Sequence, residues 1–150
     1  MDSAELEDRI RTLVEEEGFR LLQANWKPMK GGRLLRVVAD AEDHNITVDE
    51  CAALSGLICD LLDSYPYDFP DYRLEVSSPG LSHPLELWQY RKNIGRRVEV
   101  KRVVGDRKEI LCGELVAVDA TGILLRDGAL ENHVLFTAIA ETHVLPQWNR

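Results

Sequence analysis

One short run, residues 74–85, constrains the fold of this chain more than any other stretch of its sequence. Its first residues alternate between apolar and polar side chains, which is the period-two pattern of a half-buried strand. Pro79 has no N–H to donate to a β-ladder, and Gly80 readily takes the positive φ that a type II turn needs at its third residue. Pro84 favours an extended backbone at the residue before it. The run therefore predicts a strand, a stiff turn at residues 78–81, and an extended segment that leads toward a second domain.

The parts of the chain on either side of this run differ in charge. Residues 1–84 hold 17 acidic and 8 basic side chains, a net charge of −9, whereas residues 85–150 hold 9 acidic and 10 basic ones, a net charge of +1. Within the second part, residues 85–108 carry 8 basic and 3 acidic side chains, a net charge of +5. This basic window is either a solvated face or a surface for the phosphates of a nucleic acid. The acidic part is either a soluble surface or a partner for basic proteins.

The periodicity of the first part predicts an α/β domain. The start of one helix is signalled most strongly, because Thr47 and Glu50 have the spacing of a capping box. The order α-β-β-α-β predicts a three-stranded sheet covered on one face by two helices, with residues 28–32 as the loop of a β-hairpin. The expected elements are a helix from Asp2 to Gly18, strands over residues 19–27 and 33–41, a helix from Thr47 to about Ser64, and a strand that opens at Tyr72.

The second part predicts a small β-barrel. Five short strands separated by turn signals are typical of an SH3-like or Sm-like barrel, and Gly113 stands where such a barrel bends its long strand. The fold class is therefore α+β, with domains over residues 1–84 and 92–150 and a linker over residues 85–91. The expected elements are a short helix over residues 86–93 that ends at Gly95, and strands over residues 97–104, 109–118, 123–126, 133–137 and 142–145.

The positions of cysteine and histidine favour neither a disulfide nor a metal site. Cys51 and Cys59 lie on one predicted helix, about 12 Å apart along its axis, which exceeds the reach of a disulfide. Cys112 stands alone in a predicted strand, and the 4 histidines are scattered without the spacing of metal ligands. We therefore expect no metal and no cofactor.

The hydrophobic runs of the chain are short. None approaches the roughly 20 residues that span a bilayer, and the acidic start of the chain does not resemble a signal peptide. The sequence therefore predicts a cytoplasmic protein without a membrane segment.

These patterns together resemble the RimP family of ribosome maturation factors over nearly the whole chain. The resemblance rests on the α-β-β-α-β order, the Ser-Ser-Pro-Gly-Leu core at residues 77–81, Ile94-Gly95-Arg96 ahead of the barrel, and the strand that contains Gly113. It implies a non-catalytic assembly factor that binds the free small (30S) ribosomal subunit and assists its maturation. It also implies contact with ribosomal RNA and, through the barrel, with a small-subunit ribosomal protein near the decoding region.

The chain departs from the family pattern at two places. Ser82-His83 stands where the family commonly has Asp-Arg, and Glu141 stands where a lysine often opens the last strand. Each change removes a positive charge near neutral pH.

Three groups of residues are candidates for contact with the ribosomal subunit. The residues of the central run form either a stiff interdomain turn or a direct ribosome contact: Ser77, Ser78, Pro79, Gly80, Leu81, Pro84 and Leu85. The other candidates are RNA contacts, namely the hairpin residues Lys27, Lys30 and Arg33, and the basic-window residues Arg91, Lys92, Arg96, Arg97 and Lys101.

Two other classes of function compete with an assembly factor. A Sm-like barrel could form an oligomeric RNA-binding ring, which would sediment as a particle much larger than the 17.0 kDa chain. A serine hydrolase would need a nucleophile, a base and an orienting acid, for which the candidates are Ser77 or Ser78, His83, and Asp68 or Asp71. The chain has no G-x-S-x-G elbow, and a serine followed by proline in a tight turn offers no evident oxyanion hole. We therefore expect a monomeric binding protein and not an enzyme.

Overall fold

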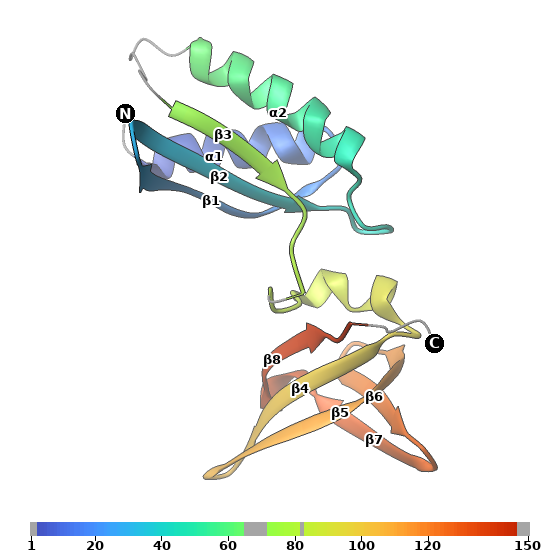
Figure 1. The fold of residues 1–150 in the computed structure, drawn as a ribbon. Coiled ribbons are helices and arrows are strands. Elements are labelled where there is room, and N and C mark those ends of the chain that lie inside the picture. Colours follow the sequence, from blue (N-terminus) through green and yellow to red (C-terminus); the bar gives the residue numbers. More distant parts are fainter. Residues whose placement is uncertain (1–2, 65–71, 82, 147–150) are drawn as a thin grey trace. The chain divides into compact units, whose positions relative to one another are not determined.

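The computed structural model of the protein describes residues 3–64, 72–81 and 83–146 (Figure 1). The chain divides into two compact units, Met1–Pro79 and Gly80–Arg150. The first unit contains two helices and a three-stranded sheet, and the second contains a five-stranded antiparallel sheet. This arrangement confirms the predicted α+β class.

The first unit has the predicted α-β-β-α-β order. Its sheet has the order β1-β2-β3, in which β1 and β2 are antiparallel and β2 and β3 are parallel. Both helices lie on the same face of the sheet (Figure 1). The elements are α1 (Ser3–Glu16), β1 (Arg20–Met29), β2 (Gly32–Asp40), α2 (Val48–Asp63) and β3 (Tyr72–Ser77).

One hydrophobic core holds the two helices against the sheet. Ile10 and Val14 of α1 and Ile58 of α2 have no exposed surface. From the sheet, β2 contributes alternate residues, including Leu35 and Val37, which are 1% and 0% exposed. Full burial of an aliphatic side chain of this size is worth about 1.5–3 kcal/mol. The core therefore fixes which face of the sheet the helices cover.

The first helix ends at the predicted glycine. Gly18 has a φ of 91°, its N–H donates to the Glu15 carbonyl at 3.0 Å, and the Phe19 N–H donates to the Val14 carbonyl at 3.1 Å. This pair of hydrogen bonds is a Schellman motif, in which a glycine takes the left-handed conformation at low steric cost. The predicted N-cap, Asp2, lies outside the described residues.

The second helix begins with the predicted capping box. The Glu50 N–H donates to Thr47 Oγ1 at 3.1 Å, and the Thr47 N–H donates to Glu50 Oε1 at 2.9 Å. Ile46 and Cys51, on either side of the cap, pack into the same core cluster. The helix start is thus set by local hydrogen bonds and by a hydrophobic staple.

The β1–β2 hairpin is tighter than the sequence predicted. Met29 pairs with Gly32 and Pro28 pairs with Arg33, so the connecting loop is Lys30-Gly31 rather than residues 28–32. Pro28 fits in the ladder because β1 is an edge strand, where a missing N–H removes no bond to a neighbour on the open side.

The second unit contains the predicted five strands, in the order β7-β6-β5-β4-β8. Its core includes Val98, Val100, Leu115 and Ile123, all with no exposed surface. This β-rich architecture is compatible with an SH3-like barrel. The strands are β4 (Arg97–Val104), β5 (Arg107–Val118), β6 (Gly122–Asp127), β7 (Leu130–Leu135) and β8 (Ile139–Val144).

The predicted short helix over residues 86–93 is helical, but of the 3-10 type and in two pieces. The segment forms two 3-10 turns, η1 (Leu87–Gln89) and η2 (Arg91–Asn93). Side-chain amides satisfy its backbone groups, because the Glu86 N–H donates to Gln89 Oε1 at 2.8 Å and Asn93 Nδ2 donates to the Gln89 carbonyl at 2.8 Å. A single α-helix of this length would be marginal without such partners.

The last two strands begin earlier than predicted. A third 3-10 turn, η3 (Phe136–Ala138), separates β7 from β8 at residues that the sequence placed in a strand or a loop. The Phe136 N–H donates to the Thr121 carbonyl at 2.9 Å, a contact across the sheet that local sequence does not reveal.

The long strand β5 changes partner at the predicted glycine. It pairs with β4 up to Glu114 and with β6 from Glu114 onward. A Cβ on Gly113 would lie 2.8 Å from the Arg126 carbonyl oxygen. Glycine therefore permits the close approach of two backbones at this point.

Candidate functional site

The central run leaves β3 where predicted, but its turn lies two residues later. The hydrogen-bonded turn is closed by the His83 N–H, which donates to the Gly80 carbonyl at 3.0 Å. The positive-φ glycines in the described chain do not include Gly80. The predicted turn at residues 78–81 is therefore wrong. The turn is positioned by tertiary hydrogen bonds further along the segment, which local turn chemistry does not encode.

Those hydrogen bonds connect the segment to β8. The Leu85 N–H donates to the Thr142 carbonyl at 2.8 Å, and His143 Nδ1 lies 3.3 Å from the Leu81 carbonyl oxygen. Leu81 is 49% exposed although it is apolar, so its side chain is available to a partner. Of the remaining candidate residues in this run, Ser78, Gly80 and Pro84 are exposed, and Ser77, Pro79 and Leu85 are half-buried.

Glu141, one of the departures from the family pattern, belongs to a small charged cluster on β8. His143 Nε2 lies 3.0 Å and Lys101 Nζ lies 4.0 Å from the Glu141 carboxylate. The hydrogen bond with His143, helped by the charge of Lys101, lowers the pKa of Glu141. Lys101, a candidate RNA contact, therefore has a carboxylate beside it. The other departure begins at Ser82, which lies outside the described residues.

The three hairpin cations are exposed but do not form one cluster. Lys27 pairs with Leu34, whereas Arg33 pairs with Pro28, so the two side chains belong to opposite faces of the sheet. The Arg33 guanidinium lies 4.8 Å from the centre of the Trp26 ring, a cation–π contact. Lys30 sits in the connecting loop between them.

The cations at residues 91–97 of the basic window divide into two kinds. Arg91, Arg96 and Arg97 are exposed, and no described carboxylate forms an ion pair with them. Lys92, in contrast, is half-buried with its Nζ 6.0 Å from the centre of the Trp88 ring. The exposed arginines are therefore the stronger candidates for contact with phosphates.

Strand alternation in β4 is as predicted. Val98 and Val100 are fully buried, while Arg97 and Lys101 are exposed and Glu99 between them is half-buried. The outward face of β4 therefore mixes both signs of charge.

Two further basic residues were missed as site candidates. Arg36 of β2 and Arg73 of β3 lie on the same sheet face as Lys27. They are far apart in the sequence and meet only because β2 and β3 pair in parallel through the α2 crossover. Alternation within each strand predicts which of its residues share a face, but it does not predict which strands are neighbours in the sheet.

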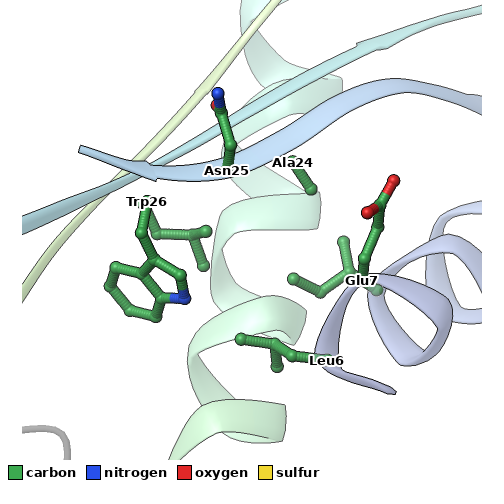
Figure 2. Close-up of a pocket in the computed structure, with 7 residues that line it drawn as sticks. Leu6, Glu7, Ala24, Asn25 and Trp26 are labelled. Carbon is green, nitrogen blue, oxygen red and sulfur yellow. The ribbon is translucent and has the colours of Figure 1, made fainter. Parts of the chain in front are cut away.

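A pocket of about 310 Å³ lies between α1 and β1 (Figure 2). Figure 2 shows Ala24 and Trp26 directed toward the helices and Asn25 directed to the other side of the sheet. Among its described lining residues Glu7 is the ionisable one, so the pocket offers no pair of groups for acid–base chemistry. The lining residues are Leu6, Glu7, Ile10, Ala24, Asn25, Trp26 and Leu35.

The residues considered for hydrolase chemistry are not assembled in the described part of the chain. The N–H of His83 is used in the turn, and no described hydrogen bond joins its ring to Ser77 or Ser78. The two candidate acids, Asp68 and Asp71, lie outside the described residues.

The three cysteines are free. No group of three or more metal-ligating side chains occurs within residues 3–64, 72–81 and 83–146.

The helices of the described residues are too short or too polar to cross a membrane. The fold defines an α+β protein of two compact units, and its candidate cations Arg91, Arg96 and Arg97 are exposed.

Residues 9–82 match the family model described as the RimP N-terminal domain. The match extends from α1 through β3 and into the central run. The chain belongs to the RimP family. Members of this family are ribosome maturation factors without catalytic activity.

Proposed function

We propose that the protein binds the free small (30S) ribosomal subunit during its maturation, as a monomer in the cytoplasm. The observation that carries this proposal is the match of residues 9–82 to the RimP N-terminal domain. The five-stranded second unit, compatible with an SH3-like barrel, agrees with it.

The proposed contacts are of two kinds. The exposed arginines of the basic window, Arg91, Arg96 and Arg97, supply positive charge for ribosomal RNA. The barrel unit contacts a small-subunit ribosomal protein near the decoding region. Leu81 and Pro84 of the central run are exposed beside this unit's last strand and extend that contact.

The protein acts by selective binding and not by catalysis. A factor that binds one conformation of the immature subunit more tightly than others raises the population of that conformation. It is released when later assembly steps remove the difference in affinity. The effect on the conformational equilibrium equals the difference in binding free energy between the two states.

Co-sedimentation of the full chain with purified 30S subunits and with assembled 70S ribosomes tests the proposal. We expect binding to 30S subunits and at least tenfold weaker binding to 70S ribosomes, a difference of about 1.4 kcal/mol. Equal binding to both particles would contradict a role in maturation. Sedimentation of the free protein distinguishes the monomer from the Sm-like ring, because a ring would be several times larger than 17.0 kDa.

A further inference from the structure

The sheet of the first unit has one face that no helix covers (Figure 1). Residues paired across neighbouring strands point to the same face, so Lys27 of β1, Leu34 of β2 and Arg73 of β3 form one row across it. Lys27 and Arg73 are exposed, and Leu34 between them is half-buried. Two strand spacings separate the two cations by about 10 Å. The row thus places positive charges on either side of an aliphatic side chain.

The neighbouring row adds a third cation. Asn25, Arg36 and Glu75 are paired across the three strands, and Figure 2 shows Asn25 directed away from the helix side. Arg36 Nε lies 3.6 Å from Glu75 Oε1, a distance that makes an ion pair but is too long for a hydrogen bond. Within the described part of the chain, Arg36 Nε is buried without a hydrogen-bond partner. The Arg36 side chain as a whole is 36% exposed, so the rest of its guanidinium group is open to an added oxygen ligand.

The charge of these two rows is opposite to that of the domain around them. Three cations, Lys27, Arg36 and Arg73, face one carboxylate, Glu75. Residues 1–84 as a whole have a net charge of −9, from 17 acidic and 8 basic side chains. The bare sheet face is therefore a local site for an anion on an acidic domain.

We propose that this face, defined by Lys27, Arg36 and Arg73, binds the phosphate backbone of an RNA strand. The inference rests on the proposed function and assigns a ligand class to the first unit. Guanidinium groups bind phosphate oxygens through two parallel N–H bonds, and the lysine adds a point charge. Neither row contains an aromatic side chain for base stacking, so binding has little sequence preference.

An acidic protein is the competing ligand for the same charges. The core of a protein interface needs a contiguous apolar area around its charged groups. The two rows offer one aliphatic side chain, Leu34, among polar and charged neighbours. RNA phosphates, which need charge and donors rather than apolar area, fit this composition better.

The test compares two double variants of the full chain. Lys27→Gln with Arg73→Gln removes two positive charges from the bare face. Arg9→Gln with Arg11→Gln removes two positive charges from α1, on the helix-covered side, where each arginine pairs with a glutamate one turn earlier. Both variants are checked by circular dichroism, and Lys27→Arg with Arg73→Lys serves as the charge-conserving variant.

The probes are a polyuridylate oligonucleotide, a polyglutamate peptide and 30S subunits, each titrated at several KCl concentrations. We expect the bare-face variant to bind the oligonucleotide on the order of tenfold more weakly, with a salt slope reduced by about one unit for each cation removed. The α1 variant and the charge-conserving variant keep the affinity and slope of the native protein.

Equal oligonucleotide affinity and salt slope in the bare-face and α1 variants would overturn the proposal. A loss of polyglutamate binding without a loss of RNA binding would also overturn it, in favour of an acidic protein partner. If the native protein fails to bind 30S subunits while the bare-face variant loses oligonucleotide binding, the proposed function fails and the RNA-binding face stands.

Discussion

The Tyr90 hydroxyl donates a hydrogen bond of 2.8 Å to Thr142 Oγ1, and both side chains are buried. The Thr142 carbonyl accepts a second bond from the Leu85 N–H at 2.8 Å. Thr142 of β8 therefore holds the segment before the barrel at two points. Burial raises the pKa of Tyr90, although the bond to Thr142 opposes this shift. The hydroxyl thus remains protonated and able to donate at neutral pH.

Replacing Tyr90 with phenylalanine should lower the free energy of unfolding of the second unit by about 1–2 kcal/mol. The change keeps the ring contact with Phe136, whose centre lies 5.3 Å away, but leaves the buried Thr142 hydroxyl without its donor. Urea denaturation followed by amide NMR signals of the second unit measures the effect. Thr142→Val completes a double-mutant cycle, and strictly additive effects would contradict a direct interaction.

Replacing Gly113 with alanine should destabilise the second unit by about 1–3 kcal/mol, because the added methyl group meets the Arg126 carbonyl oxygen, a backbone atom that cannot rotate away. Gly56→Ala in α2 is the matched control, since a Cβ there meets no atom within 4 Å. Alanine at this helical position should stabilise the first unit by about 0.5–1 kcal/mol. The same denaturation experiment measures both, and equal effects of the two substitutions would refute the steric argument.

The start of α2 and the end of α1 were predictable because their signals are local. Thr47 and Glu50 satisfy each other's backbone groups within one helical turn, and Gly18 follows directly on the helix that it ends. The alternation of buried and exposed residues in β4 was predictable for the same reason. The sequence also singled out Gly113 in β5, where the structure shows a close approach to the Arg126 backbone that a Cβ would obstruct.

The parts that the sequence did not reveal depend on contacts between distant segments. The turn closes at residues 80–83 because Leu85 and Leu81 are bound to β8, more than fifty residues away. Arg73 joins Lys27 on one face because β3 pairs in parallel with β2. Neither the register nor the neighbour of a strand can be determined from its own alternation, so the sequence did not group Arg36 and Arg73 with Lys27.

The free energy of unfolding of the second unit should fall as the pH drops below about 4. Two bonds from Thr121 and one from the Gly122 N–H lower the pKa of Asp119 from 3.8 to about 2. Because the pKa is lower in the folded state, the stabilisation is complete above the unfolded value and is lost as the pH falls toward 2. Asp119→Asn should make the free energy of unfolding depend less on pH between about pH 4 and pH 2. An unchanged pH dependence in urea denaturation would contradict Asp119 as its source.

The free energy of unfolding of the first unit should also depend on pH, but near neutrality and with the opposite sign: it should fall as the pH rises. His44 Nε2 lies 2.8 Å from a Glu50 carboxylate oxygen, and His44 Nδ1 lies 2.7 Å from an Asp43 carboxylate oxygen. These hydrogen bonds raise the pKa of His44 above 6.5, and the bond with Glu50 has the larger effect. Its stabilisation is therefore complete below pH 6.5 and is lost as the pH rises through the raised pKa.

His44→Gln tests this dependence through urea denaturation at about pH 6 and about pH 9, on either side of the ordinary histidine range. The native protein should have a higher free energy of unfolding than the variant, and this difference should be larger at about pH 6 than at about pH 9. His83→Gln, outside this cluster, is the control. A stability difference for His44→Gln that is the same at both pH values would rule out the charged His44 as its source.

The basic window should show unequal contributions to subunit binding. Arg97→Gln should weaken binding to 30S subunits and reduce the salt slope by about one unit, since no described carboxylate is paired with Arg97. Lys101→Gln should have a smaller effect, because Glu141 lies 4.0 Å from its Nζ. Filter binding across a KCl series distinguishes the two, and an equal loss from both substitutions would show that the Glu141 contact does not persist in the complex.

The strand order of the two sheets has a consequence for the growing polypeptide. Every strand of the first sheet precedes residue 78, so that unit has all its pairing partners early in synthesis. The second sheet closes β4 against β8, and β8 ends at Val144. A nascent chain can therefore complete its acidic unit while the edge of β4 is still unpaired and open to wrong partners. The window of greatest risk for misfolding falls between synthesis of β4 and arrival of β8.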